Sequence, residues 1–320
     1  MNMKHILLVT LLYVFASSAY AAATAKAVAI PDYPADKLSE HVWVIHGPRE
    51  FPNPKNQGFM NNPALVLTSA GAVIIDPGAS VQTGEMVLRV FGKISSAPVV
   101  AVFNTHVHGD HWLGNQAIVA KYPDVKIYAH PSMIAEAKAG AADSWVSLMH
   151  SMTEGATDGT LAVLPNASVN NAEVIKIGNT RFRIYHNGQA HTKTDIMIEA
   201  VEDSVLFLGD NVTYKRIPRM VDGSFKGNLA AIEIALATKV KTWVPGHGPS
   251  GDSAIVNAYR DYLQSVLQSA RTAFENDMDS SAVKAFALKA TDAYKDWPGY
   301  EDELGRQGVQ AYMEIEATEF

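Results

Sequence analysis

The sequence contains no cysteine, so it can form neither a disulfide framework nor a lipid anchor attached through a cysteine. It also lacks repeats, low-complexity segments and any run of basic residues. The 320 residues carry a net charge of −7, which argues against a nucleic acid or an anionic membrane as a partner. With 48% hydrophobic residues the chain can bury an ordinary core. Separately, we expect its partner to be a small-molecule substrate.

An apolar run at the N-terminus, from Ile6 to Phe15, follows Lys4 and precedes small residues that end in Ala19-Tyr20-Ala21. This pattern is typical of a secretory signal peptide over residues 1–21. A run of about ten residues is too short to cross a bilayer of roughly 30 Å, so we expect no membrane anchor after cleavage. The predicted location is secreted or periplasmic.

The densest group of chemically active residues is His106, His108, Asp110 and His111, directly after the apolar run 99–103, which reads as a buried strand. Two residues apart in an extended segment, His106 and His108 leave the same side of the backbone and can bind one ion. Asp110 and His111 follow where a helix can begin, so they face elsewhere and indicate a second ion. The alternative is a helix-capping Asp110 with surface histidines. It is disfavoured because such closely spaced histidines would repel one another on protonation without a cation.

Strands and helices alternate in the first half of the chain, and strands follow one another from residue 172 onward. The expected strands are residues 41–45, 64–68, 72–76, 99–103, 125–129, 173–177, 181–185, 195–201, 204–208 and 242–244. The expected helices are residues 83–94, 112–121, 131–154 and 229–238. This order predicts an α+β or α/β four-layer αββα sandwich over residues 22–252. Residues 253–320 show only helical patterns and form a C-terminal helical extension.

Three later strands each end with one potential ligand, namely His191, Asp210 and His247. Strand ends gather at one edge of such a sheet, where ligands commonly bind. Any one of these residues alone is more often part of a turn. Together with the dense cluster, they are hard to explain as coincidence.

In this ordered set the chain resembles the metallo-β-lactamase-fold superfamily of hydrolases. The resemblance implies the same αββα sandwich and assigns the ligands to two metals. The first metal would take His106, His108 and His191, the second would take Asp110, His111 and His247, and Asp210 would bridge both. Asp76, before Pro77-Gly78, corresponds to the family aspartate that lies behind the ligands and does not itself bind metal. The alternative interpretation of Asp76 is an aspartate that only forms a turn before Pro-Gly.

Two divalent ions about 3.5–4 Å apart would hold a bridging hydroxide at neutral pH. In this scheme Asp110 is also catalytic, because it can orient the water or relay its proton. Zinc is the expected ion for a site rich in histidine, and a site with two carboxylates also suits iron or manganese. The predicted function is therefore an exported dinuclear hydrolase of an ester, thioester, lactone or related bond.

An aspartate at position 210, where some lactamases have a cysteine, resembles glyoxalase-II-like and lactonase-like hydrolases. The signal peptide and the loop 58–62 are similar to exported zinc hydrolases found beside quinoprotein systems. Two alternatives stay open. One is a metallo-β-lactamase that hydrolyses antibiotics, and the other is a metal-dependent oxidoreductase or a non-hydrolytic metal-binding protein of the same fold.

Two loops contribute the predicted substrate-binding residues. The loop 47–63, rich in proline and asparagine, carries Phe59 and Met60 at its tip, where they would cover the site. The loop after Asp210 holds Tyr214, Lys215, Arg216 and Arg219, which can bind an anionic group near the metals; a solvated loop is the equal alternative.

Overall fold

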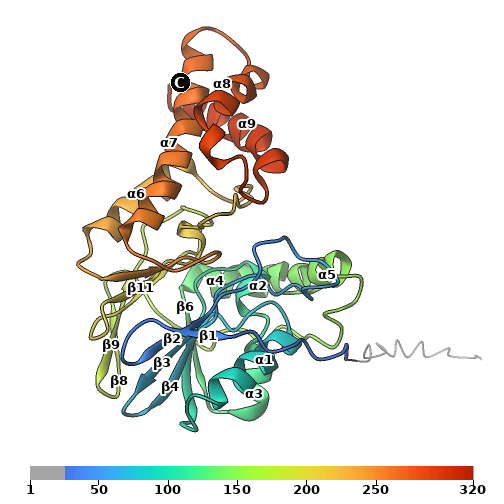
Figure 1. Cartoon of the computed structure of the whole chain (residues 1–320), viewed down its shortest axis with the longest axis vertical. Helices are drawn as coiled ribbons and strands as arrows, with labels where there is room; N and C mark the ends of the chain where they lie inside the picture. Colours follow the sequence, from blue (N-terminus) through green and yellow to red (C-terminus); the bar gives the residue numbers. More distant parts are fainter. Residues whose placement is uncertain (1–25, 320) are drawn as a thin grey trace, which may run out of the picture.

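Two β-sheets packed face to face form the body of the protein, with helices on their outer faces (Figure 1). The structure is a computed structural model that describes residues 26–319, so the predicted signal peptide lies outside the described residues. The predicted four-layer sandwich with C-terminal helices is confirmed. No helix in residues 26–319 combines the length and apolar character that a membrane span requires.

The first sheet has seven strands in the order β1-β2-β3-β4-β5-β6-β7. These are β1 (Ala35–Lys37), β2 (Val42–Ile45), β3 (Ala64–Thr68), β4 (Gly71–Ile75), β5 (Val99–Phe103), β6 (Lys126–Ala129) and β7 (Ala167–Ser168). Strands β4 to β7 run parallel to one another. The carboxyl ends of parallel strands meet at one edge, so Asp76 and the cluster that begins at His106 leave the sheet side by side.

The second sheet has five strands in the order β12-β11-β10-β9-β8. They are β8 (Val174–Ile177), β9 (Thr180–Tyr185), β10 (Met197–Ala200), β11 (Val205–Phe207) and β12 (Thr242–Val244). Buried residues of both sheets form one hydrophobic core between them. Phe103 and Phe182 meet across this core, with ring centroids 5.3 Å apart. This contact packs the two sheets against each other at the end of β5, close to the histidine cluster.

The helices outside the sheets are α1 (Val81–Gly92), α2 (Gly109–Trp112), α3 (Asn115–Lys121), α4 (Pro131–Glu136), α5 (Ala142–Met152) and α6 (Phe225–Ala237). The predicted helix 112–121 is wrong as one element, because the chain turns at Gly114 between α2 and α3. Gly114 donates to the Gly78 carbonyl and lies too close to Pro77 for a side chain. The predicted helix 131–154 is interrupted at Gly140, whose φ of 118° lies outside the helical region.

Helix α6 begins at Phe225, earlier than the predicted residue 229, because the Ser224 side chain accepts a hydrogen bond from the Gly227 N–H at 3.0 Å. The short edge strands β1 and β7 were not expected, since neither shows an alternating apolar pattern.

The C-terminal helices α7 (Ser253–Glu275), α8 (Val283–Ala290) and α9 (Tyr300–Glu319) rise above the sandwich (Figure 1). Their buried residues share a core with the second sheet and α6. Helix α9 also holds the loop that leads from Asp210 toward α6. Gln307 donates to the Pro218 carbonyl at 2.7 Å, and Glu314 accepts from the backbone N–H groups of Phe225 and Lys226. The extension therefore supports one wall of the region described next.

Candidate metal centre

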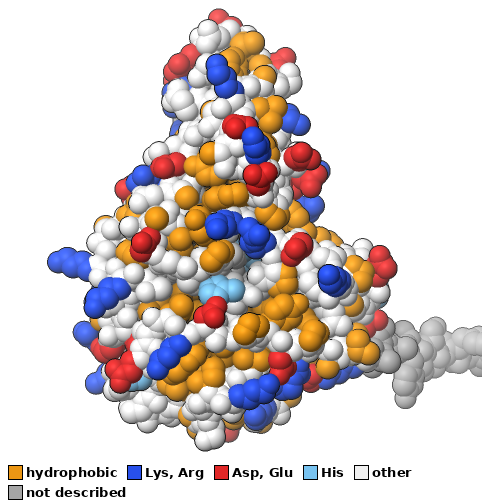
Figure 2. All heavy atoms as spheres, viewed as in Figure 1, with side chains coloured by type: hydrophobic (Ala, Val, Ile, Leu, Met, Phe, Trp, Pro, Cys, Tyr) orange, Lys and Arg blue, Asp and Glu red, His pale blue; other side chains and the backbone are white. Residues whose placement is uncertain are grey.

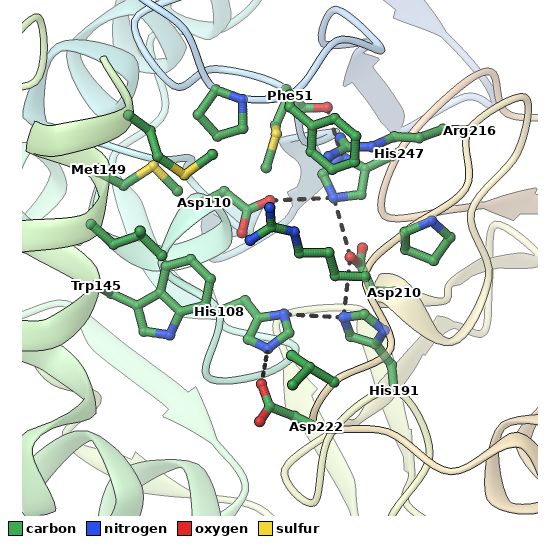
Figure 3. A pocket seen from close by; sticks show the side chains of 17 residues that line it. Phe51, His108, Asp110, Trp145, Met149, His191, Asp210, Arg216, Asp222 and His247 are labelled. Atoms are coloured by element: carbon green, nitrogen blue, oxygen red, sulfur yellow. Dashed lines mark hydrogen bonds and ion pairs between the residues drawn. The ribbon is translucent and has the colours of Figure 1, made fainter. Parts of the chain in front are cut away.

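The edge where the two sheets meet brings all seven predicted ligands together. Figure 3 shows the five that face the cavity, namely His108, Asp110, His191, Asp210 and His247. Among residues 26–319 the seven ligands form two groups, each with ligand atoms within 4.8 Å of one another: His106, His108, His191 and Asp210, and then Asp110, His111 and His247. This is the division that the family resemblance implied. Asp210 also lies between the groups, because its carboxylate oxygens are 3.2 Å from Nε2 of His111 and of His247.

The geometry of these atoms fits metal ions. Nδ1 of His108 faces Nε2 of His191 at 3.0 Å, and Nε2 of His111 faces Nε2 of His247 at 3.4 Å. Two nitrogens bound tetrahedrally to one zinc ion at about 2.0–2.1 Å would lie roughly 3.3 Å apart. Nε2 of His106 is buried without a hydrogen-bond partner, as are Oδ2 of Asp110 and Oδ1 of Asp210. A cation would give each of these buried polar atoms a partner.

Hydrogen bonds to Asp76 and Thr105 set the tautomers of two ligands. The Asp76 carboxylate accepts the Thr105 backbone N–H at 2.8 Å, the Thr105 hydroxyl at 2.7 Å and Nδ1–H of His111 at 2.8 Å. Because the hydroxyl donates to Asp76, its oxygen accepts from Nδ1–H of His106 at 3.0 Å. Both imidazoles then keep the Nε2 lone pair free for an ion. Asp76 thus holds the supporting position that the resemblance implied.

His108 and His247 are fixed in the same way by hydrogen bonds on the side away from the site. Nε2–H of His108 donates to Asp222 at 3.1 Å and leaves Nδ1 facing the site. Nδ1–H of His247 donates to the Met60 carbonyl at 2.8 Å and leaves Nε2 facing the site. Nη1 of Arg216 lies 2.9 Å from the same Nδ1. Since that nitrogen carries the proton for Met60, we assign no hydrogen bond between it and Arg216.

Burial and neighbouring charges shift the pKa values of the ligand side chains. Burial opposes ionisation of Asp110 and Asp210, but His111 and His247 outweigh burial and hold the pKa of both carboxyls well below the usual range. Burial and the neighbouring histidines His111 and His108 lower the pKa of His106. Burial also lowers the pKa of His191, to about 3. His106 and His191 are therefore already neutral, as metal ligands must be. The carboxylates of Asp110 and Asp210 outweigh burial and raise the pKa of His111 well above its usual value, so His111 must release a proton when an ion binds.

Asp195 supports the loop that carries His191, and sequence reasoning missed it. Its carboxylate accepts the backbone N–H of Thr192 at 2.6 Å and the Thr192 hydroxyl at 2.9 Å. Burial raises the pKa of Asp195 to about 7. The next threonine, Thr194, accepts the Val107 N–H at 3.0 Å and so ties this loop to the histidine cluster. A turn containing two threonines and an aspartate was the only signal available.

A cavity of about 220 Å³ opens above the ligands. Figure 2 shows this face, with histidine at the floor of a hollow that has cationic side chains along one rim and hydrophobic side chains around it. The floor is His108, Asp110, His191, Asp210 and His247. The walls are Phe51, Pro52, Met60, Trp145, Leu148, Met149, Met152, Arg216, Pro218, Arg219, Val221 and Asp222.

Three of the predicted substrate-binding residues lie in this wall, namely Met60, Arg216 and Arg219. The prediction that Phe59 covers the site is wrong, because its side chain is fully buried in the core against Tyr33. The same correction applies to Tyr214 and Lys215, which do not line the cavity. Tyr214 packs against Trp297, and the Lys215 ammonium lies over the Tyr214 ring.

The contribution of α5 was also missed. Its residues Trp145, Leu148, Met149 and Met152 form much of one wall. Their spacing is that of one helical face, but from sequence alone such a face reads as ordinary core. Only the position of α5 relative to β5 shows that this face meets the ligands.

Comparison with known proteins gives the same picture. Residues 57–247 match the family described as the Metallo-beta-lactamase superfamily. A linear primary-alkylsulfatase of Pseudomonas sp. (strain ATCC 19151) is 40% identical over 74 residues, which cover 22% of this chain and 14% of that protein. A hydroxyacylglutathione hydrolase of Nostoc sp. is 42% identical over 57 residues, which cover 18% of this chain and 20% of that protein. The chain thus spans only a minor part of these curated relatives.

Solved structures share the fold over a longer stretch. A sec-alkylsulfatase of Pseudomonas sp. superposes with a TM-score of 0.68 at 15% identity, covering 88% of this chain and 50% of that one. A metallo-beta-lactamase from Pontibacter korlensis superposes with a TM-score of 0.58 at 22% identity, covering 72% of this chain and 98% of that one. At these identities the likeness concerns the fold.

Proposed function

Because the chain belongs to the metallo-beta-lactamase superfamily, we propose that it is an exported metal-dependent hydrolase of a small molecule with an ester, thioester, lactone or related bond. The observation that carries this proposal is the convergence of seven buried ligand side chains, in two groups, on the floor of a cavity. Relatives named as a hydroxyacylglutathione hydrolase and an alkylsulfatase support hydrolysis as the class of reaction. Export rests on the N-terminal pattern alone.

The donor set suits two divalent ions, with zinc as the proposed metal and iron or manganese as alternatives. When bound, such ions lower the pKa of a water to about 7 and polarise the bond under attack. His106, His108 and His191 would hold one ion, Asp110, His111 and His247 would hold the other, and Asp210 would contact both.

The protein side chains have three tasks in this scheme. Asp110, buried on the floor of the cavity, orients the attacking water and accepts its proton. Asp76 and Thr105 keep lone pairs of His106 and His111 directed at the site. The apolar wall from α5 limits access of bulk water, which strengthens the electrostatic interactions within the site.

The test is metal loading followed by a substrate screen. Mature protein reconstituted in excess zinc should contain close to two ions per chain by elemental analysis, and at most one ion would disprove the dinuclear assignment. The loaded protein should then hydrolyse at least one substrate from a panel of thioesters, lactones, carboxyl esters, alkyl sulfates and β-lactams. Failure with the whole panel, while both ions are bound, would contradict the hydrolase proposal. Turnover of β-lactams alone would favour the antibiotic alternative.

A further inference from the structure

We infer that the substrate of this site is an anionic amphiphile, with an unbranched apolar chain on one side of the scissile bond and a negative charge on the other. The inference rests on the proposed function for the reaction and adds the class of compound. It comes from two opposed walls of the cavity, one apolar and one cationic, with the ligand side chains between them (Figure 3).

The apolar wall is one face of α5. Trp145, Leu148, Met149 and Met152 are spaced by three, four and seven residues from the first, so they lie on one side of the helix, and all four line the cavity. Leu148 is part of this wall and is 39% exposed. A contiguous apolar face left open beside a reactive site marks a place where an apolar ligand binds.

The shape of this wall favours a linear chain. Methionine is unbranched and flexible, so Met149 and Met152, with Met60 from the opposite loop, can follow an alkyl chain of variable length. The wall begins at the ligands themselves, because the Trp145 ring lies 4.9 Å from the ring of His108. A chain attached to the reacting group would therefore meet apolar surface from its first carbons onward.

The opposite wall carries two arginines. Arg216 is only 3% exposed, and its guanidinium lies 4.6 Å from the centroid of the Phe51 ring. Its Nε has no hydrogen-bond partner, and its Nη1 lies 2.9 Å from the protonated Nδ1 of His247, which cannot accept. A buried cation in the wall of a cavity with unsatisfied donors can bind an anionic group there.

Arg219 stands at the rim of the same wall. Its Nε donates to Oε1 of Glu303 at 3.3 Å, and its side chain is 56% exposed, so its terminal nitrogens stay available. Two acidic side chains near Arg219 are already engaged, since Asp222 accepts from His108 and Glu303 accepts from both Arg219 and Arg306. Among the residues that line the cavity, Arg216 and Arg219 are the two with a lysine or arginine side chain.

The positions of the walls fix the orientation of the substrate. In Figure 3, Trp145 and Met149 lie on one side, Arg216 lies on the other, and Asp110 lies between them. A bond placed over the ligands thus directs one end of the molecule to each wall. Both an alkyl sulfate and an acyl ester of an anionic alcohol or thiol have this arrangement, and the assay below includes both.

The first experiment measures kcat/KM of the zinc-loaded protein with two series of substrates. One is a set of nitrophenyl esters from acetate to decanoate, each with a neutral and a carboxylate-bearing nitrophenol. The other is a set of alkyl sulfates of matched length. We expect kcat/KM to rise about fourfold per methylene until the wall is filled, and charged esters to exceed neutral ones roughly tenfold.

Matched variants then test each wall. Leu148→Asn has nearly the same shape and should flatten the dependence on chain length, whereas Leu288→Asn on α8, at 46% exposure, should leave it unchanged. Arg219→Gln should lower kcat/KM roughly tenfold for charged esters only. Arg306→Gln should have no effect, although it removes a bond to the same Oε1 of Glu303. Arg219→Lys should recover part of the loss.

Binding without turnover provides the second readout. Calorimetry with alkyl sulfonates, which are not hydrolysed, should show tighter binding from butanesulfonate to decanesulfonate, and Leu148→Asn should weaken the longer ligands most. Equal behaviour of the Leu148 and Leu288 variants would overturn the apolar subsite, and equal behaviour of the Arg219 and Arg306 variants would overturn the anionic one. If no substrate is hydrolysed, the proposed function fails while calorimetry still decides this inference.

Discussion

Replacing Asp76 by Asn tests how the ligand shell is oriented. Asp76 is a nearly buried carboxylate, with its side chain 6% exposed, and it accepts three hydrogen bonds, two from Thr105 and one from Nδ1–H of His111. Its φ of 49° is left-handed, a conformation that Asn tolerates as Asp does. The Asp76→Asn variant should therefore keep the backbone and change only the hydrogen-bond pattern.

The size of the effect follows from those bonds. If the amide oxygen keeps the Thr105 N–H, the amide NH₂ faces His111 and must find a lone pair on Nδ1. The proton of His111 then moves to Nε2, the atom that faces the metal group, and opposes binding there. Losing an outer partner of this kind reduces metal affinity by about 10–100-fold, which corresponds to about 1.4–2.8 kcal/mol.

Asp76→Ala separates this effect from a loss of stability. It leaves three donors without their acceptor, and alanine at a left-handed φ costs about 1–2 kcal/mol more. We expect the unfolding free energy of the metal-free protein to fall by roughly 3 kcal/mol or more with Ala and by about 1 kcal/mol with Asn.

The assays are competition for zinc with a chromogenic chelator and urea unfolding of the metal-free protein. Asp203→Asn is the matched control, because Asp203 is a carboxylate with a 3% exposed side chain that accepts from Ser39 and the His41 N–H instead. Unchanged zinc affinity in Asp76→Asn would refute the reasoning about the His111 tautomer. A loss of the same size in Asp203→Asn would show that any buried charge change disturbs the site.

Three further predictions concern neighbouring features. Asp210→Ala should abolish hydrolysis and lower the metal content while circular dichroism stays unchanged, and retained turnover would make Asp210 a turn residue only. Gly246→Ala would place a methyl group on the Asp210 carboxylate and should weaken zinc binding at least tenfold by chelator competition, whereas Gly305→Ala on α9 has room and should not. Burial and then His186 lower the pKa of His130 from 6.5 to about 4, so neutral His130 favours folding above pH 6.5, and this stability is lost as the pH falls toward 4. His130→Asn keeps a capping side chain on α4 and should make urea unfolding less sensitive to pH in that window; an identical pH profile would contradict the assignment.

Much of the fold was predictable because local pattern and tertiary structure agree. The apolar runs before Asp76 and His106 are buried parallel strands, and the alternation in 173–185 is the β8-β9 hairpin. The errors occur where single contacts override the pattern. Helix 112–121 is broken because Gly114 packs against Pro77, and helix 131–154 is broken because Gly140 leaves the helical conformation.

The site was predictable to a different degree. The spacing of His106, His108 and the following Asp110-His111 pair separates two groups by itself. The pairing with His191 and His247 depends on the approach of two sheets, which the sequence expresses only through resemblance to a family. Side chains that hydrogen-bond to a ligand or to a ligand-bearing loop gave no usable signal in the sequence. Asp195, for example, is predicted only as the first residue of the strand 195–201, and Asp222 shows no pattern, until their bonds to Thr192 and His108 are seen.

Each ligand group joins the two halves of the molecule, since the 106–111 segment follows β5 of the first sheet and His191, Asp210 and His247 follow strands of the second. A bound ion is therefore a removable cross-link in a chain that has no disulfide. The unfolded chain does not hold these ligands together, so affinity for the ion becomes resistance to unfolding, about 2.7 kcal/mol per site when free ion is a hundredfold above its Kd. In the proposed location outside the cytoplasm, proteases would degrade the copies without metal first, and the surviving population would be enriched in metal-loaded protein.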